Sequence, residues 1–209
     1  MAASKTKSET DTKQKLLNAA MKLMLCKGFK ATTVDDICAE AGLTKGSFFH
    51  YFDGKEDLAK ATAKHFHAFQ QCMFDGADFR SLADPLDRVF GRLDFIAGIA
   101  RNPQIPKSCL VGNLVQEVAG THEDIRSVCE SAFNSAVADF ERDVAAAKLK
   151  HAPSAEFEPA SVARLYLTLI QGSMILVKAS KNAAIFEENV EHLRRYIESL
   201  FGKPHSRKK

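Results

Sequence analysis

Apolar side chains recur along most of the chain at the three- and four-residue spacing of amphipathic helices. No segment shows a convincing alternation of β-branched and polar residues, so strands are not expected. Breaks of glycine, proline and polar residues separate the periodic segments, which predict longer helices over residues 13–27, 55–74, 85–100, 109–118, 123–150, 160–179 and 184–201. We therefore expect an all-α fold.

Residues 33–58 carry two shorter helical patterns that are joined by a glycine. Thr33 is placed to cap a first helix, and Gly42 is placed to end it. Thr44 can then cap a second helix that continues to Phe52. The first helix has its apolar residues on one stripe: Val34, Ile37, Cys38 and Ala41. A short helix, a tight turn and a second helix with an exposed polar face are how many proteins read the major groove of DNA.

This segment resembles the N-terminal helix-turn-helix of the TetR family of bacterial one-component regulators. The residues that match the usual pattern of the family are Thr33, Ile37, Ala41, Gly42, Leu43, Thr44, Gly46, Phe48, Tyr51, Phe52, Lys55 and Leu58. The resemblance implies a three-helix DNA-binding domain followed by a larger helical domain for effector binding and dimerisation. One position departs from the pattern, because Phe49 stands where the family commonly has a tyrosine whose hydroxyl reaches a phosphate. Phe49 would offer an apolar surface to a sugar or a thymine methyl group instead.

The resemblance also implies which side chains contact DNA. Thr33 and Lys55 are expected to hold phosphates, and the aromatic pair at the end of the second helix either contacts phosphate or packs between helices. The first arginine of the chain is Arg80, so Lys45 is the principal candidate for a base contact. The complete set of expected DNA contacts is Thr33, Thr44, Lys45, Gly46, Ser47, Phe49, His50, Tyr51 and Lys55.

The predicted helices and the resemblance to the TetR family divide the chain into three functional parts. Residues 1–55 are expected to form the DNA-binding domain, with residues 1–11 as a flexible arm. Residues 56–203 form the effector-binding and dimerisation domain, and residues 204–209 form a basic tail.

A homodimer is expected through the last two helices, over residues 160–179 and 184–201. The first of them is apolar nearly all round and so needs cover on every side. Gly172 and Ser173 lie in its middle and would allow another helix to approach closely. The alternative is that this helix is only the central core helix of one subunit.

A second segment, residues 107–126, resembles the C-L-x-x-x-L-x-x-E pattern of one branch of TetR regulators, which includes repressors that respond to electrophiles and reactive chlorine through its cysteine. Cys109 is the matching residue, and a helix N-terminus and Lys107 nearby would favour its thiolate. The alternative is that Cys109 is a small buried side chain that seals a ligand cavity. The candidate effector or redox residues are Cys109, Phe69, Met73, Phe95, Phe133 and Met174.

Composition limits the remaining possibilities. The chain has 209 residues, a net charge of +3 and five cysteines at scattered positions, without a metal-binding spacing or a disulfide framework. No apolar run approaches the length of a membrane span, and the N-terminus lacks the apolar core of a secretory signal, so we expect a cytoplasmic protein that does not contact a membrane. His65 and His67 point to different helix faces, so neither a metal nor a cofactor is expected.

These observations favour a homodimeric DNA-binding regulator, most simply a repressor that a small-molecule inducer releases from a palindromic operator. One alternative is a repressor that senses electrophiles or oxidants through Cys109. Another, from a different class, is a helical binding protein or an enzyme without operator specificity. No ordering of catalytic residues and no glycine-rich phosphate loop supports an enzyme.

Overall fold

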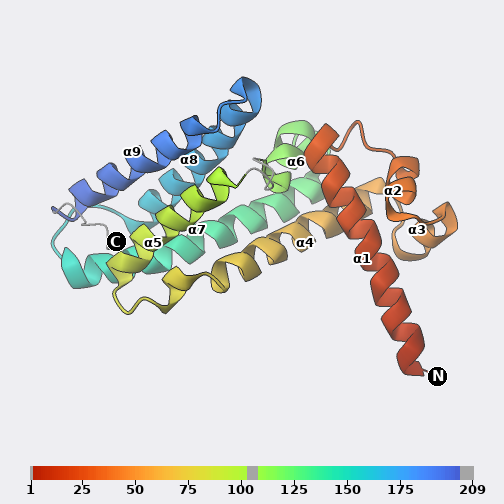
Figure 1. Cartoon of the computed structure of the whole chain (residues 1–209), viewed down its shortest axis with the longest axis horizontal. Helices are drawn as coiled ribbons and strands as arrows, with labels where there is room; N and C mark the ends of the chain where they lie inside the picture. The colour runs from red at the N-terminus through yellow and green to blue at the C-terminus, as the bar shows by residue number, and fades with distance from the viewer. Residues whose placement is uncertain (1, 103–107, 203–209) are drawn as a thin grey trace. The chain divides into compact units, whose positions relative to one another are not determined.

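The computed structural model describes residues 2–102 and 108–202, with the backbone alone for residues 2–10, and within these ranges every regular element is a helix (Figure 1). The prediction of an all-α fold is confirmed. The predicted basic tail and Lys107 lie outside the described residues. The elements are α1 (Ala2–Lys27), α2 (Val34–Ala41), α3 (Lys45–Tyr51), α4 (Lys55–Asp75), the 3-10 helix η1 (Asp78–Ser81), α5 (Pro85–Arg101), α6 (Leu110–Val118), α7 (Glu123–His151), α8 (Pro159–Ser180) and α9 (Ala184–Leu200).

The first helix begins earlier than predicted. Its expected start was residue 13, but α1 begins at Ala2, so residues predicted to form a flexible arm continue the helix. Residues 2–27 contain neither glycine nor proline. Adding residues to a helix that already exists costs much less than starting one, and this explains the longer helix.

Contacts between residues divide the chain into two compact units, and the first unit contains Met1–Gln71 and Cys109–Ala132. It therefore includes α1 to α3, the greater part of α4, α6 and the start of α7. The predicted functional division at residue 55 stays a prediction, because these units follow packing and not function. The side chains at the centre of the first unit are fully buried: Leu16, Ala20 and Met24 of α1, Ile37 of α2, Phe48 of α3 and Leu58 of α4.

The second unit contains Cys72–Ser108 and Phe133–Lys209, and its core lies among α5, α8, α9 and the later part of α7. Helices α8 and α9 pack side by side (Figure 1). The buried hydroxyl of Ser173 joins them, because it accepts a hydrogen bond from Asn189 Nδ2 at 3.0 Å and donates to the Leu169 carbonyl. Ser173 therefore faces α9, whereas a Cβ added at Gly172 would meet nothing within 4 Å, so close approach of a second subunit at Gly172 stays a prediction.

By length and composition, α8 is apolar enough to cross a membrane, which the sequence analysis did not expect. Core helices of soluble proteins share this length and composition. Three of its large apolar side chains are exposed: Leu165, Ile175 and Leu176. This exposure is what an interface with a second subunit would cover.

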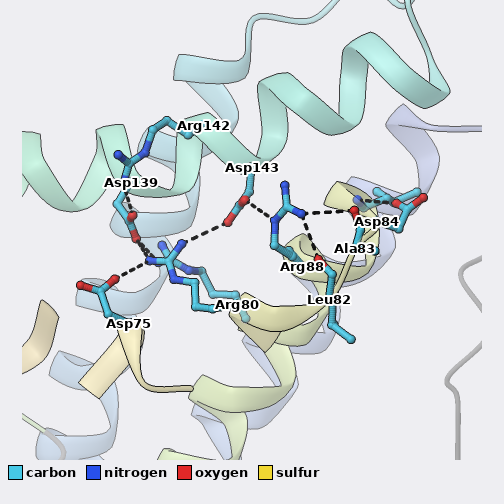
Figure 2. Close-up of polar contacts among 11 residues, drawn as sticks. Asp75, Arg80, Leu82, Ala83, Asp84, Arg88, Asp139, Arg142 and Asp143 are labelled. Carbon is cyan, nitrogen blue, oxygen red and sulfur yellow. Dashed lines mark hydrogen bonds and ion pairs between the residues drawn. The ribbon is translucent and has the colours of Figure 1, made fainter. Parts of the chain in front are cut away.

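A network of ion pairs ties η1 and α5 to α7 within the second unit (Figure 2). Asp143 accepts from Arg88 Nε at 2.8 Å and from Arg80 Nη1 at 3.4 Å, and its side chain is only 9% exposed. Asp139 pairs with Arg80, Arg92 and Arg142. Burial raises the pKa of Asp139, but the three guanidinium groups outweigh burial and hold that pKa below its usual range.

Arg92 is the most deeply buried cation of this network, with a side chain that is 3% exposed. Its guanidinium carbon lies 4.8 Å from the centre of the Phe74 ring and 5.4 Å from that of Phe140. The aromatic faces stabilise the cation, while Asp139 supplies the opposite charge. The network therefore depends on Asp139.

We predict that Asp139→Asn lowers the free energy of unfolding at pH 7 by about 3–5 kcal/mol, because Arg92 is left buried without its anion. The folded-state pKa of Asp139 lies below the unfolded value of about 3.9. Ionised Asp139 therefore stabilises the folded state above that pH, and this stabilisation is lost as the pH falls from the unfolded pKa through the folded one. Urea denaturation between pH 7 and pH 3 measures both effects, and the variant should lose less stability than the wild type over this interval.

Asp75→Asn is the matched control, because Asp75 pairs with the same Arg80 but is 72% exposed. It should change the free energy of unfolding by less than about 1 kcal/mol. Equal losses in the two variants would show that burial does not determine the strength of this network.

Candidate nucleic-acid interface

Helix α2, the first helix of the helix-turn-helix, is fixed by hydrogen bonds at both of its ends. Thr33 Oγ1 accepts from the Asp36 amide at 3.1 Å, and the Thr33 amide donates to Asp36 Oδ2 at 2.9 Å, so α2 starts with a capping box. Gly42 ends α2 in the left-handed conformation at φ 66°, which favours glycine. Its amide donates to the Ala39 carbonyl, and the chain turns directly into α3.

Helix α3 is held by two buried aromatic side chains. Phe48 is fully buried and Phe52 is 3% exposed, with 5.8 Å between their ring centres. Thr44 Oγ1 accepts from the Ser47 amide at 3.2 Å and so caps the N-terminus of the helix. These contacts turn the opposite face outward.

The predicted DNA contacts lie mainly on this outward face. Thr44, Lys45, Gly46, Phe49 and His50 are exposed, and Ser47 and Tyr51 are half-buried. The His50 and Tyr51 rings meet edge to face at 4.7 Å. The structure thus brings the residues of α3 together on one surface, while their contacts with DNA stay a prediction.

Lys45 is already paired in the free protein. Its Nζ lies 2.8 Å from Asp35 Oδ1 in the first turn of α2, and this hydrogen bond raises the pKa of Lys45. Both side chains are more than half exposed, so water screens their attraction and a phosphate or base can replace the carboxylate. Asp35 was not predicted as a partner of Lys45, although its place in the acidic first turn of α2 was a signal.

Lys55 has a structural partner that the sequence did not reveal. Its Nζ donates to the Phe29 carbonyl at 3.1 Å and lies 4.3 Å from the centre of the Phe29 ring. Thr33 is exposed but uses its hydroxyl within the cap of α2. The phosphate contacts expected of Thr33 and Lys55 stay predictions.

The six candidate effector residues are divided between the two units. Phe69, which is 56% exposed, and Cys109 belong to the first unit, and Met73, Phe95, Phe133 and Met174 belong to the second. Phe95 packs edge to face on Phe74 and, with Leu82 and Gly91, lines an open hollow of about 500 Å³. A common effector role for the six residues stays a prediction.

Cys109 is 6% exposed and occupies the N-cap of α6, where its Sγ accepts from the Gly112 amide at 3.5 Å. Cys129 is also buried, and burial raises its pKa to about 11 with a further contribution from nearby Cys109. Among residues 2–102 and 108–202, no group of three or more His, Cys, Asp or Glu side chains is placed to hold a metal ion. His65, which was considered as a metal ligand in the sequence analysis, has its Nε2 atom 2.9 Å from Gln14 Nε2.

A family model described as bacterial regulatory proteins, tetR family, matches residues 16–62, and one described as the C-terminal domain of LmrA/YxaF-like transcriptional regulators matches residues 85–192. The chain belongs to the TetR family. It is therefore a DNA-binding transcriptional regulator, as predicted. The first model spans the whole helix-turn-helix, and the second covers about half of the chain.

Several TetR-family relatives match over most of their length. The chain is 29% identical to an HTH-type regulator in the lacX 3′ region of Lactococcus lactis, over 91% of this chain and 95% of the relative. It is 30% identical to YxaF of Bacillus subtilis, over 84% and 89%. It is 24% identical to the repressor NemR of Escherichia coli, over 91% and 96%. The reduced form of NemR has the same fold, with a TM-score of 0.78 over 88% of this chain and 96% of NemR.

The two adjacent phenylalanines of α3 give a direct test of which face is turned outward. We predict that Phe48→Ala lowers the free energy of unfolding by about 3–5 kcal/mol, because Phe48 is fully buried. Phe49→Ala should change it by less than about 0.5 kcal/mol, because Phe49 is 57% exposed. Urea denaturation measures both values, and similar losses for the two variants would contradict the orientation of α3.

Proposed function

We propose that this TetR-family protein is a repressor that binds a palindromic operator as a homodimer and leaves it when a small-molecule inducer binds. The main support is the outward face of α3, where a capped helix exposes five of the predicted DNA contacts while Phe48 and Phe52 anchor the other face. NemR, a relative over nearly its whole length, is a transcriptional repressor. The proposed contacts are Thr33, Thr44, Lys45, Gly46, Ser47, Phe49, His50, Tyr51 and Lys55.

The side chains divide into those that position the protein and those that read sequence. Lys45 is the proposed base reader, because it lies in the first turn of α3, which helix-turn-helix proteins direct at base edges. On binding it would exchange Asp35 for an acceptor in the major groove. The exposed ring of Phe49 would pack on a sugar or thymine methyl. Thr44, Gly46 and Ser47 would approach base edges or the DNA backbone. The proposed phosphate contacts are Thr33, His50, Tyr51 and Lys55.

The homodimer is proposed to form through α8 and α9. Leu165, Ile175 and Leu176 of α8 and Tyr196 of α9 are large apolar side chains with 40% or more of their surface exposed. Pairing with the same surface of a second subunit would cover them and form a four-helix bundle. Two-fold symmetry then matches a palindrome, in which the half-sites are about one helical turn apart or a multiple of it.

The inducer is proposed to bind in the larger helical domain, where Phe95 borders an apolar hollow and Met73, Phe133 and Met174 are partly buried. It releases DNA only if it binds the DNA-free conformation more tightly than the DNA-bound one. We further propose that the protein acts in the cytoplasm and is not an enzyme, because the relatives are named as transcriptional regulators.

The experiment that tests this function is selection of duplex DNA from a random pool by the purified protein, followed by gel shifts at several salt concentrations. A regulator should select a palindrome and bind it at least about 10³-fold more tightly than random duplex. An architectural DNA-binding protein would retain duplexes without sequence preference, and a helical enzyme or carrier would retain none. Either of these results contradicts the proposal.

The role of Lys45 gives a sharper prediction on the selected duplex. Lys45→Ala should weaken binding by about 5- to 150-fold and relax the preference at one base pair in each half-site, because a base contact is lost. Fluorescence anisotropy with duplexes substituted at each position measures this. Lys64→Ala, which removes an exposed lysine of α4, is the control and should preserve both affinity and preference. A uniform loss over all sequences in Lys45→Ala would mean that Lys45 contacts only phosphate.

A second candidate function is sensing of electrophiles by Cys109, which its place at the N-cap of α6 supports, where the Gly112 amide donates a hydrogen bond to its sulfur. N-ethylmaleimide serves as the probe. The thiolate would add to its carbon–carbon double bond, a sulfur–carbon bond would form, and the resulting carbanion would take a proton from water. The added group would enlarge a side chain that is 6% exposed and displace α6.

We predict that N-ethylmaleimide releases the protein from the selected duplex and that Cys109→Ser prevents the release. The test uses a protein in which the exposed Cys26 and Cys72 are already replaced by Ser, so that their reaction does not contribute. Cys129→Ser in the same background is the control and should remain sensitive. If the Cys109→Ser protein still leaves the DNA, Cys109 is a packing residue and not a switch.

A further inference from the structure

One carboxylate of α6 binds the backbone of the segment between α1 and α2, directly before the helix-turn-helix. Glu117 lies in the last turn of α6, and its two oxygens accept hydrogen bonds from consecutive amides. Oε1 accepts from the Phe29 amide at 3.1 Å, and Oε2 accepts from the Lys30 amide at 2.9 Å. All of these residues belong to the first compact unit, in which α6 packs beside α1 (Figure 1). Glu117 therefore holds the junction between α1 and α2 at two adjacent points.

The backbone of the junction is shaped to receive this carboxylate. Gly28 ends α1 at φ +85°, and a Cβ added there would lie 2.6 Å from Glu117 Oε1. A side chain at this position would meet both backbone strain and the carboxylate. Thr32 Oγ1 donates to the Gly28 carbonyl at 2.6 Å and closes the turn. The glycine thus gives the carboxylate access to the two amides.

The same junction is held from a second side by Lys55 and His122. Lys55 Nζ donates to the carbonyl of Phe29, the residue whose amide Glu117 binds. The ring of His122 packs edge to face on the Phe29 ring, with 5.9 Å between the centres. Phe29 itself is 3% exposed. The carboxylate of Glu117, the ammonium group of Lys55 and the ring of His122 together fix the direction in which the chain leaves α1 and enters α2.

The orientation of α2 matters because α3 follows it after a turn of three residues, and α3 packs on both α1 and α2. A change in the junction therefore changes the tilt of α3. Hydrogen bonds that involve a charged group are stronger than those between neutral groups. The bond from the Phe29 amide is partly buried, and the bond from the Lys30 amide is exposed. Glu117 is also the acidic residue at the end of the Cys-Leu pattern that begins at Cys109.

We propose that Glu117 is a positioning residue: its carboxylate sets the orientation of the helix-turn-helix for operator binding, and loss of its two hydrogen bonds is the step through which a change at α6 releases the DNA. The inference rests on the proposed repressor function. Helix α6 has nine residues and a length of about 13 Å, so a displacement at its Cys109 end is carried to Glu117 at the other end. Glu117 does not touch DNA in this proposal and acts through the backbone of Phe29 and Lys30.

The test is Glu117→Gln, which keeps the shape of the side chain. Its amide oxygen can accept from one of the two backbone amides, but its NH₂ group cannot accept from the other. The matched control is Glu130→Gln, because Glu130 is an exposed carboxylate of α7 that pairs with Arg126. Both variants remove one negative charge, so a general charge effect on DNA binding should be equal in the two.

Three readouts separate positioning from a loss of folding. Glu117→Gln should bind the selected duplex about tenfold more weakly than the wild type, while its affinity for random duplex stays within about twofold. Hydrogen exchange at the Phe29 and Lys30 amides should become faster, and the melting temperature should change by only a few degrees. Glu130→Gln should match the wild type in all three. If Glu117→Gln melts below the assay temperature, Glu117→Asp, which keeps the charge but reaches less far, takes its place.

Each outcome bears on the proposal. Faster amide exchange with unchanged affinity for the selected duplex would overturn the positioning role, and unchanged exchange would show that the contact itself is absent in solution. Equal losses on selected and random duplex would assign Glu117 a structural role alone. A wild-type protein that selects no duplex would overturn the repressor function, and the positioning role with it, even where Glu117 protects the two amides.

Discussion

The burial of one face of α3 is the interaction on which the candidate DNA-binding surface depends. Phe48 and Phe52 fill the space between α3 and the helices beneath it, and this burial turns Lys45 and Phe49 toward solvent. Without the anchored face, a helix of seven residues would not be stable in water, because helices of this length depend on packing. The same contact thus makes α3 a helix and sets which side chains can meet DNA.

The parts of the fold that could be predicted are those that local sequence determines. Asp84 and Pro85 start α5, Gly42 ends α2, and Thr33 and Thr44 cap α2 and α3 as expected. The start of α1 was predicted too late, because a polar and charged segment without glycine or proline carries no stop signal and simply continues the helix. The outward face of α3 followed from the same spacing rules, together with the resemblance to a family.

The contacts that were missed join residues far apart in the sequence. Glu117 meets Phe29 and Lys30 almost ninety positions away, and in the other unit Arg80 meets Asp139, which lies 59 positions further along the chain. No periodicity or spacing encodes such pairs, although a charged residue within an otherwise apolar helix is a signal that it has a partner. The first compact unit consequently includes α6, which the predicted division at residue 55 assigned to the effector domain.

The measurement that tests the central claim most directly is hydroxyl-radical footprinting of the selected duplex, combined with sedimentation of the complex. The account predicts two subunits for each duplex and two protected patches on one face of the DNA, with the half-sites about one helical turn or a multiple of it apart. A single protected patch, or a complex with one subunit, would contradict a dimer that presents two copies of α3 to successive major grooves.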